Sequence, residues 1–251
     1  MTGVQTCALP ISKELLYAIF LPGLVFEAAF HLDFHKFWQN KLAIHALAVP
    51  GVAAAIGITA VLLQPAASAL HFVDGFTMKH ALVFAALIAA TDPIAVVALF
   101  KTLGAPKRLA VLVEGESLLN DGTAVVFFTL ILGAVTGDSL SIGGAVVDFV
   151  RVVGLGTLVG VLVGYLASKL TQRVDDPMIE ITLTTIAAYG SFIIAEHFHL
   201  SGVIATVAAG MLCGNYGART GMSPSTRIAV ESFWEYVAFA LNSIVFLLIG
   251  F

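Results

Sequence analysis

Eight apolar stretches, each long enough to cross a lipid bilayer or nearly so, dominate this chain. A helix rises about 1.5 Å per residue, so about 20 apolar residues cross a hydrocarbon core of about 30 Å. Only 11% of the residues are charged, against about 25% in soluble domains. We therefore predict an all-α, polytopic membrane protein with about eight transmembrane helices, at residues 14–31, 42–63, 81–100, 109–135, 145–168, 178–196, 201–217 and 228–251.

The basic residues are distributed asymmetrically between the connecting loops. Nine of the twelve lie in the first, third, fifth and seventh loops. Cytoplasmic loops carry an excess of Lys and Arg, so we expect these odd-numbered loops to be cytoplasmic. Basic residues that lie in ones and twos form no patch for nucleic acid, and we expect no nucleic-acid partner. The nine are Lys36, Lys41, Lys101, Lys107, Arg108, Lys169, Arg173, Arg219 and Arg227.

Two of the apolar stretches contain acidic residues, which a lipid-embedded helix rarely carries. Thr91-Asp92-Pro93 interrupts the stretch 81–100, and residues 114–121 of the next stretch contain three more acids. An ionisable side chain deep in a membrane helix is expensive and marks a functional site by default. Pro93 removes a backbone donor, so we expect the helix to break near Ala89–Thr91. Freed carbonyls at membrane depth line cavities, and transporters use such breaks to coordinate cations.

The acidic residues fall into a pattern that suits a hard cation. Asp121 lies four residues after Ser117 and seven after Glu114, so the three share one helix face, with Glu116 and Asn120 on the adjacent face. Oxygen ligands favour hard cations. A purely structural alternative pairs these acids with buried basic residues. Only Arg151, near the end of a stretch, could serve, which accounts for one acid at most.

Four other features have structural rather than functional interpretations. Gly156, Gly160 and Gly164 place small residues on one helix face, which favours close helix packing. Cys213 suits a small core residue. We expect Trp38 and Trp234 to anchor helices at the membrane interface, and Glu196 to be solvated.

Several motifs together resemble the monovalent cation:proton antiporter family, in its NhaP-type sodium/proton exchanger branch. The resemblance covers about residues 15–251. Its most specific parts are the paired Thr-Asp-Pro and Asn-Asp motifs, in Ala90-Thr91-Asp92-Pro93 and Gly115-Glu116-Ser117-Leu118-Leu119-Asn120-Asp121. Supporting matches are Leu21-Pro22-Gly23-Leu24-Val25-Phe26-Glu27-Ala28, Ala195-Glu196, Leu200-Ser201-Gly202-Val203-Ile204-Ala205, Phe233-Trp234-Glu235 and Leu241-Asn242-Ser243.

The resemblance implies roles for individual residues. Asp121 and Asp92 would carry the exchanged cation or proton, and Ser117, the Thr91 carbonyl and Glu27 would complete the cation ligands. Glu116, Asn120 and Pro93 would support the site structurally. In the family Glu116 pairs with an arginine of a later helix, and no such arginine precedes Phe251.

The resemblance also implies the fold and the setting. We expect part of an inverted-repeat antiporter bundle, a homodimer in the plasma membrane, and a transporter rather than an enzyme, with no cofactor. Residues 1–12 resemble translated adapter sequence, and residues 13–251 would be a partial antiporter domain truncated at both ends.

The expected reaction is electroneutral exchange of sodium for protons. Burial disfavours a charged carboxylate, so a proton and a cation would compete for one site, exposed alternately to each side. Asn120, in place of a second aspartate beside Asp121, favours one proton per cation. Potassium as the cation, a passive cation pathway and, remotely, an intramembrane aspartyl protease remain alternatives.

Overall fold

The computed structural model describes residues 13–70, 75–137 and 142–250, and within them all regular structure is helical. The expectation for residues 1–12 lies outside the described residues. The helices are α1 (Lys13–His31), α2 (Phe34–Gln39), α3 (Lys41–Ala46), the π-helix η1 (Leu47–Gly51), α4 (Val52–Ala69), α5 (Met78–Leu87), α6 (Ile94–Leu103), α7 (Lys107–Thr136), α8 (Ile142–Thr171), α9 (Pro177–His197), α10 (Gly202–Leu212), the π-helix η2 (Cys213–Gly217), α11 (Ala218–Thr220) and α12 (Pro224–Gly250).

Every predicted apolar stretch coincides with helical structure, which confirms the all-α prediction. Among the described residues, five helical segments are long and apolar enough to cross a membrane, and α1 and α5 are shorter apolar helices. The five segments are Lys41–Ala69, Arg108–Thr136, Gly143–Thr171, Pro177–His197 and Pro224–Leu248.

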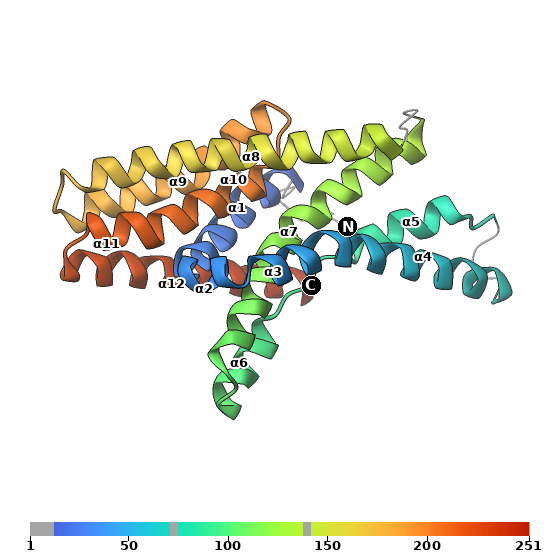
Figure 1. Ribbon diagram of the computed structural model, residues 1–251, viewed down its shortest axis with the longest axis horizontal. Helices are drawn as coiled ribbons and strands as arrows, with labels where there is room; N and C mark the ends of the chain where they lie inside the picture. The colour runs from blue at the N-terminus through green and yellow to red at the C-terminus, as the bar shows by residue number, and fades with distance from the viewer. Residues whose placement is uncertain (1–12, 71–74, 138–141, 251) are drawn as a thin grey trace, which may run out of the picture.

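Helices α1, α8, α9, α10 and α12 form a bundle, in which α10 is the most enclosed (Figure 1). The predicted glycine face of α8 packs directly against α10. A Cβ added at Gly156 would lie 2.8 Å from the Ser201 carbonyl oxygen, and Gly160 and Gly164 meet the backbone of Ala205 and Ala209. A larger side chain would push the two helices apart, so the prediction of close packing is confirmed.

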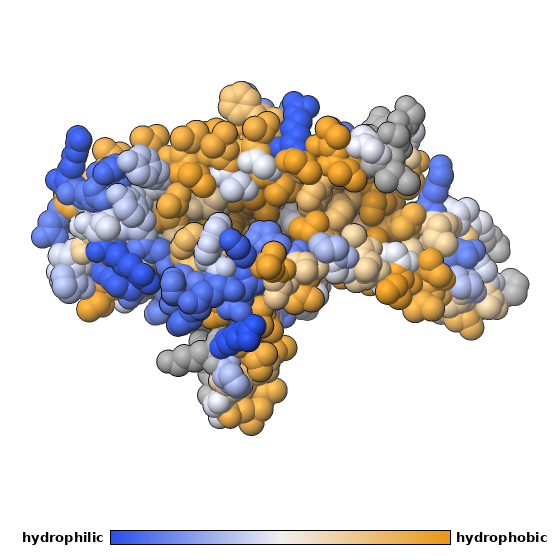
Figure 2. Space-filling view, viewed as in Figure 1, coloured by the Kyte–Doolittle hydropathy of each residue, from blue (hydrophilic) through white to orange (hydrophobic). Residues whose placement is uncertain are grey.

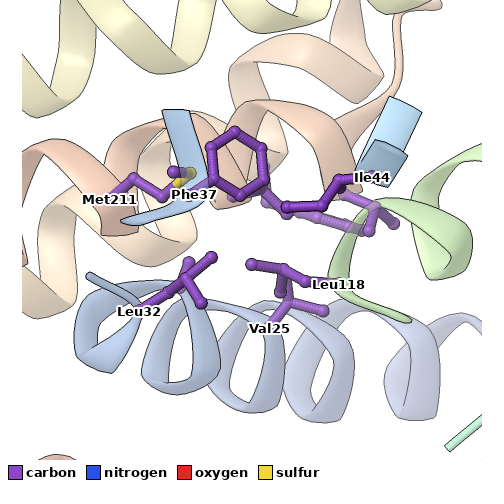
Figure 3. Packing of buried hydrophobic residues seen from close by; sticks show 10 residues of the cluster. Val25, Leu32, Phe37, Ile44, Leu118 and Met211 are labelled. Carbon is purple, nitrogen blue, oxygen red and sulfur yellow. The ribbon is translucent and has the colours of Figure 1, made fainter. Parts of the chain in front are cut away.

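An apolar cluster joins this bundle to α2, α3 and α7. Figure 3 shows Val25, Leu32, Phe37, Leu118 and Met211 close together, with Ile44 of α3 beside them. All six side chains are buried. Between membrane helices such packing stabilises through van der Waals contact rather than through removal of apolar surface from water, and here it holds α7 against α1.

The prediction that Trp234 anchors a helix at the membrane interface is wrong. Trp234 is 1% exposed, and its ring lies 4.6 Å from that of Phe26. Its indole Nε1 donates a hydrogen bond to Thr184 Oγ1 (3.1 Å). The residue is therefore a core side chain between α1, α9 and α12, because its one polar atom is satisfied inside the bundle. Trp38 is exposed, and Cys213 is buried as expected.

Helices α4 and α5 pack on each other and extend away from the bundle, while α6 projects together with the first turns of α7 (Figure 1). Their outward faces carry large apolar side chains, including Ile58, Leu62, Phe84 and Leu87. In the view of Figure 2 the surface over α4 and α8 is largely hydrophobic, and hydrophilic residues gather at the end where α9, α11 and α12 lie. An apolar outer surface of this kind suits contact with lipid.

Candidate functional site

The helix break was predicted from Pro93, and the structure confirms it. α5 ends at Leu87, α6 begins at Ile94, and the chain between them is not helical. Two carbonyls freed by the break are satisfied by side chains of α7. Ser117 Oγ donates to the Thr91 carbonyl oxygen (2.6 Å), and Asn120 Nδ2 donates to the Ala89 carbonyl oxygen (3.2 Å).

Asn120 is the main link between α7 and the break. Its Nδ2 also donates to Thr91 Oγ1 (2.8 Å), and its side chain is 1% exposed. One turn further, Thr123 Oγ1 donates to the Ala48 carbonyl oxygen (2.6 Å) in the π-helix η1, which contains Pro50. The polar face of α7 therefore supplies hydrogen bonds to two irregular segments whose backbones lack regular α-helical partners.

A cavity of about 740 Å³ lies where α1, the break, α7 and α12 meet. Five carboxylates from these four segments line it: Glu27, Asp92, Glu114, Asp121 and Glu235. Ser117, Pro93, Asn242 and His31 also line it. Within the described part of the chain, no Lys or Arg is among the lining residues. The cavity is therefore an acidic site that favours cations.

The structure places the predicted site residues in two groups. Asp121, Asp92, Ser117, Glu27 and Pro93 line the cavity. Thr91, Glu116 and Asn120 do not, although Thr91 and Asn120 lie directly behind it through the hydrogen bonds described above. The hydrogen bonds from Asn120 to the break are consistent with the structural role predicted for this residue.

Sequence reasoning missed the contribution of α12. Glu235 and Asn242 are seven residues apart, so they share one face of α12. Both had been noted only as parts of family motifs. Their spacing was the available signal, but no local pattern shows that α12 packs beside α1. Glu114 had been placed on the face of Asp121, and it does line the cavity.

The acids line an open cavity rather than a closed coordination shell. Among the described residues, no three His, Cys, Asp or Glu side chains come close enough to hold one metal ion together. Glu27 also has a neighbour of its own, because His31 Nδ1 lies 3.2 Å from Glu27 Oε1 and 3.0 Å from the Glu27 carbonyl oxygen.

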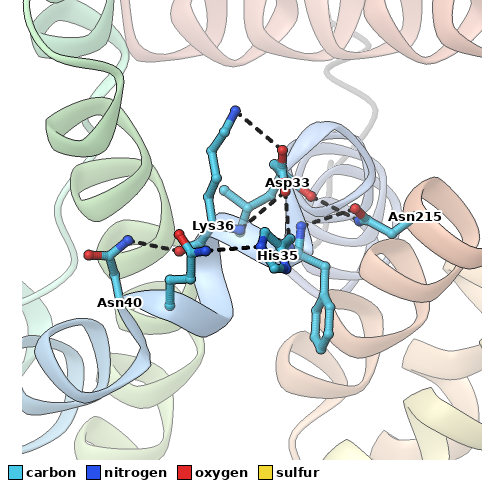
Figure 4. A network of polar contacts seen from close by, with 8 residues as sticks. Asp33, His35, Lys36, Asn40 and Asn215 are labelled. Carbon is cyan, nitrogen blue, oxygen red and sulfur yellow. Dashed lines mark hydrogen bonds and ion pairs between the residues drawn. The ribbon is translucent and has the colours of Figure 1, made fainter.

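A polar network holds the end of α1 beside the cavity (Figure 4). Asn215, in η2, donates to the Leu32 carbonyl oxygen (2.9 Å) and accepts from the Phe34 N–H (3.0 Å). Asp33 caps α2, accepting from the backbone N–H groups of Lys36 (3.2 Å) and His35 (3.0 Å). The hydrogen bond from the Lys36 N–H is the largest influence on Asp33, and it lowers the pKa of this carboxyl.

Glu196 is exposed, as expected, and it also has a partner within the protein. Its Oε1 accepts a hydrogen bond from the Gly202 N–H (3.0 Å) at the start of α10. Ser201 Oγ accepts from the Ile204 N–H (3.3 Å) in the same turn. The two side chains together satisfy backbone donors at the N-terminus of α10, where Gly202 and Ile204 are buried. Glu196 is a structural residue.

The fold and the cavity define a polytopic helical membrane protein with an acidic site at a broken helix. The chain belongs to the family of transmembrane sodium/hydrogen exchangers, whose sequence profile matches residues 3–251. The family resemblance predicted from the motifs is confirmed.

Curated relatives carry names of the same kind. The chain is 44% identical over 242 residues to the Na(+)/H(+) antiporter ApNhaP of Aphanothece halophytica, covering 96% of this chain and 45% of that protein. It is 46% identical to the low-affinity Na(+)/H(+) antiporter NhaS1 of Synechocystis, covering 96% and 44%. It is 37% identical to the Na(+)/H(+) antiporter NhaP of Pseudomonas aeruginosa, covering 95% and 56%. The chain thus spans about half the length of these relatives.

Proposed function

We propose that this protein exchanges a monovalent cation, most favourably sodium, for protons across the plasma membrane. The observation that carries the proposal is the cavity that unites Asp121, Asp92 and Glu27 from three separate segments. The relatives named as Na(+)/H(+) antiporters support sodium as the cation. Neither a cofactor nor a chemical reaction on a substrate is needed.

The coupling follows from competition for the same oxygen atoms. Protonated Asp121 cannot bind a cation, and cation-loaded Asp121 cannot hold the proton. Asp92 acts beside it, and Ser117, the Thr91 carbonyl and Glu27 contribute further oxygen ligands. Asn120, Glu116 and Pro93 keep the broken helix in register with α7. If the site opens alternately to each side, this competition alone couples the two flows.

The wider assembly is part of the same proposal. The eight apolar segments act as membrane crossings, with α5 and α6 together forming one broken crossing of an inverted-repeat bundle. The functional unit is a homodimer. Proton release and cation uptake alternate as one group of helices rocks against the other.

Substitution of the central acids tests the proposal. In the intact protein in sealed vesicles, Asp121→Asn should lower sodium-dependent proton flux by about 100-fold or more, the scale of losing an essential proton-transfer group. Asp92→Asn should be nearly as severe. The fold should remain intact, because asparagine has the same shape and removes a charge from a cavity wall.

Glu231→Gln is the matched control. Glu231 lies on α12 outside the cavity lining and pairs with Arg227 (2.8 Å), so its removal should leave the flux unchanged. Wild-type flux in Asp121→Asn would refute the site assignment. Sodium flux that never drives protons against their gradient would indicate a passive pathway instead.

A further inference from the structure

Glu180 is a buried acid that the exchange mechanism does not use. It lies in the first turn of α9, far in sequence from the cavity residues, and is 0% exposed. Neither of its carboxylate oxygens has a hydrogen-bond partner within the described chain. An ionised carboxylate in such a place loses its hydration without compensation, which is among the costliest arrangements in a protein interior.

The surroundings of Glu180 are defined by the packing of α9 against α12. Thr184, one turn further along α9, accepts the Trp234 hydrogen bond, and Asp175, just before α9, accepts one from Thr226 Oγ1 (3.3 Å). These two contacts set a parallel register between the helices. Glu180 lies between them in sequence and on the face of Thr184, so its carboxyl is enclosed at the α9–α12 interface.

The charges near Glu180 do not favour its ionised form. Asp176 caps α9 and accepts from the backbone N–H groups of Met178 (2.9 Å) and Ile179 (3.1 Å), so the donors at the helix N-terminus are already occupied. Asp175 and Asp176 both repel a negative charge on Glu180. The helix N-terminus therefore gives this carboxylate little compensation.

Of the charged side chains on the neighbouring helices, Lys169, Arg227 and His31 each have another partner. Lys169 of α8 donates to Gln172 (3.4 Å), and Arg227 of α12 pairs with Glu231. His31 of α1 lies against Glu27, and α10 has no titratable residue. Among the described residues, none of these forms an ion pair with Glu180.

We propose that Glu180 is a proton-binding site outside the exchange cavity, where the bound proton holds the ends of α9 and α12 together. With the proton, the carboxyl is neutral and its enclosure costs little. Without it, the charge must reach water, which requires α9 and α12 to separate at this end. Because α12 also carries Glu235 and Asn242, the protonation of Glu180 affects one wall of the cavity from outside.

The test compares the thermal stability of the intact protein with that of Glu180→Gln, a neutral side chain of the same shape, in detergent. The pH range is about 5 to about 9. It starts above the ordinary glutamate pKa of about 4.3, so position 180 of the unfolded wild type is ionised throughout. As pH rises, the wild-type melting temperature should fall relative to that of Glu180→Gln. The difference should reach about 3 °C or more at the alkaline end. Glu231→Gln, a partly exposed acid on α12, should keep the wild-type dependence.

Infrared difference spectra provide a second readout that does not depend on transport. The wild type should show a protonated carboxyl signal at neutral pH that Glu180→Gln lacks. If Glu180→Gln does not fold, Glu180→Met, uncharged and of similar volume, takes its place. Parallel stability curves for wild type and neutral variant, absence of the signal, or failure of both variants to fold would overturn the proposal. None of these outcomes bears on cation exchange itself.

Discussion

At the scale of single residues, the site depends on which side chains donate hydrogen bonds and which can bind and release a proton. Asn120 Nδ2 donates hydrogen bonds to the Ala89 carbonyl oxygen and to Thr91 Oγ1, and Ser117 Oγ donates one to the Thr91 carbonyl oxygen. An aspartate at position 120 could supply neither donor while ionised. The amide therefore closes the break without adding a negative charge, and Asp121, next in the chain, is left to line the cavity. Neighbouring residues on α7 thus have separate roles.

The capping interaction of Asp33 should make the stability of α2 depend on pH. Hydrogen bonds from Lys36 and His35 lower its pKa in the folded protein. The stability that it contributes is complete above the unfolded pKa of about 3.9 and is lost as pH falls through the lower folded value. Trp38 lies on α2, so its fluorescence reports on this helix. The Trp38 signal is obtained by subtracting the spectrum of Trp38→Phe from that of the wild type. It should change only below about pH 3.9.

Two variants control for that interpretation. Asp33→Asn keeps a capping oxygen but does not titrate, so the acid transition should disappear. Asp33→Ala removes the cap and should cost about 1 kcal/mol at neutral pH. A transition that persists in Asp33→Asn would assign it to another group.

At the scale of elements, the sequence predicts helices better than it predicts their partners. Apolar length is a local property, so the helix positions and the break at Pro93 could be predicted. The π-helices η1 and η2 could not, because an extra residue in a turn leaves no mark on hydropathy. The interior position of Trp234 and the place of Glu235 in the cavity depend on how α12 packs against α1, which no single stretch encodes.

Helix α7 allows a test of membrane orientation. Its 30 residues span about 45 Å, more than a hydrocarbon core of about 30 Å, so its ends should face opposite sides. From the distribution of basic residues we expect the end near Lys107 to be cytoplasmic. A cysteine at Leu103, 71% exposed, should react with an impermeant thiol reagent only from inside, and one at Thr136 only from outside.

The native cysteines do not complicate the labelling. Cys213 is 2% exposed and should be unreactive, and Cys7 can be replaced by serine. Labelling of Leu103→Cys and Thr136→Cys from the same side would contradict α7 as a membrane crossing. Labelling from opposite sides in the reverse sense would contradict only the orientation.

At the scale of the whole molecule, α7 connects two separately packed parts. One face joins the cluster of Val25, Phe37 and Leu118, and its later turns join α4 and α5 through Phe127 and Ile131. The acidic cavity lies beside α7, and its other lining residues come from α1 and α12 of the bundle and from the break and α6, which follow α5. A relative movement of the two would change the distance between Asp121 on α7 and Glu235 on α12. This geometry suits a site that must open on either side in turn.

For the proposed exchange, the stoichiometry follows from which groups in this cavity can exchange a proton for a cation. Asn120 is held by hydrogen bonds to the broken helix and cannot carry a proton, so Asp121 is the single titrating residue of that pair. We expect one proton per monovalent cation and no net charge moved per cycle. In vesicles clamped with potassium and valinomycin, an imposed membrane potential should leave the initial rate unchanged. A rate that rises with voltage would show that a second acid, with Asp92 the first candidate, also exchanges its proton during the cycle.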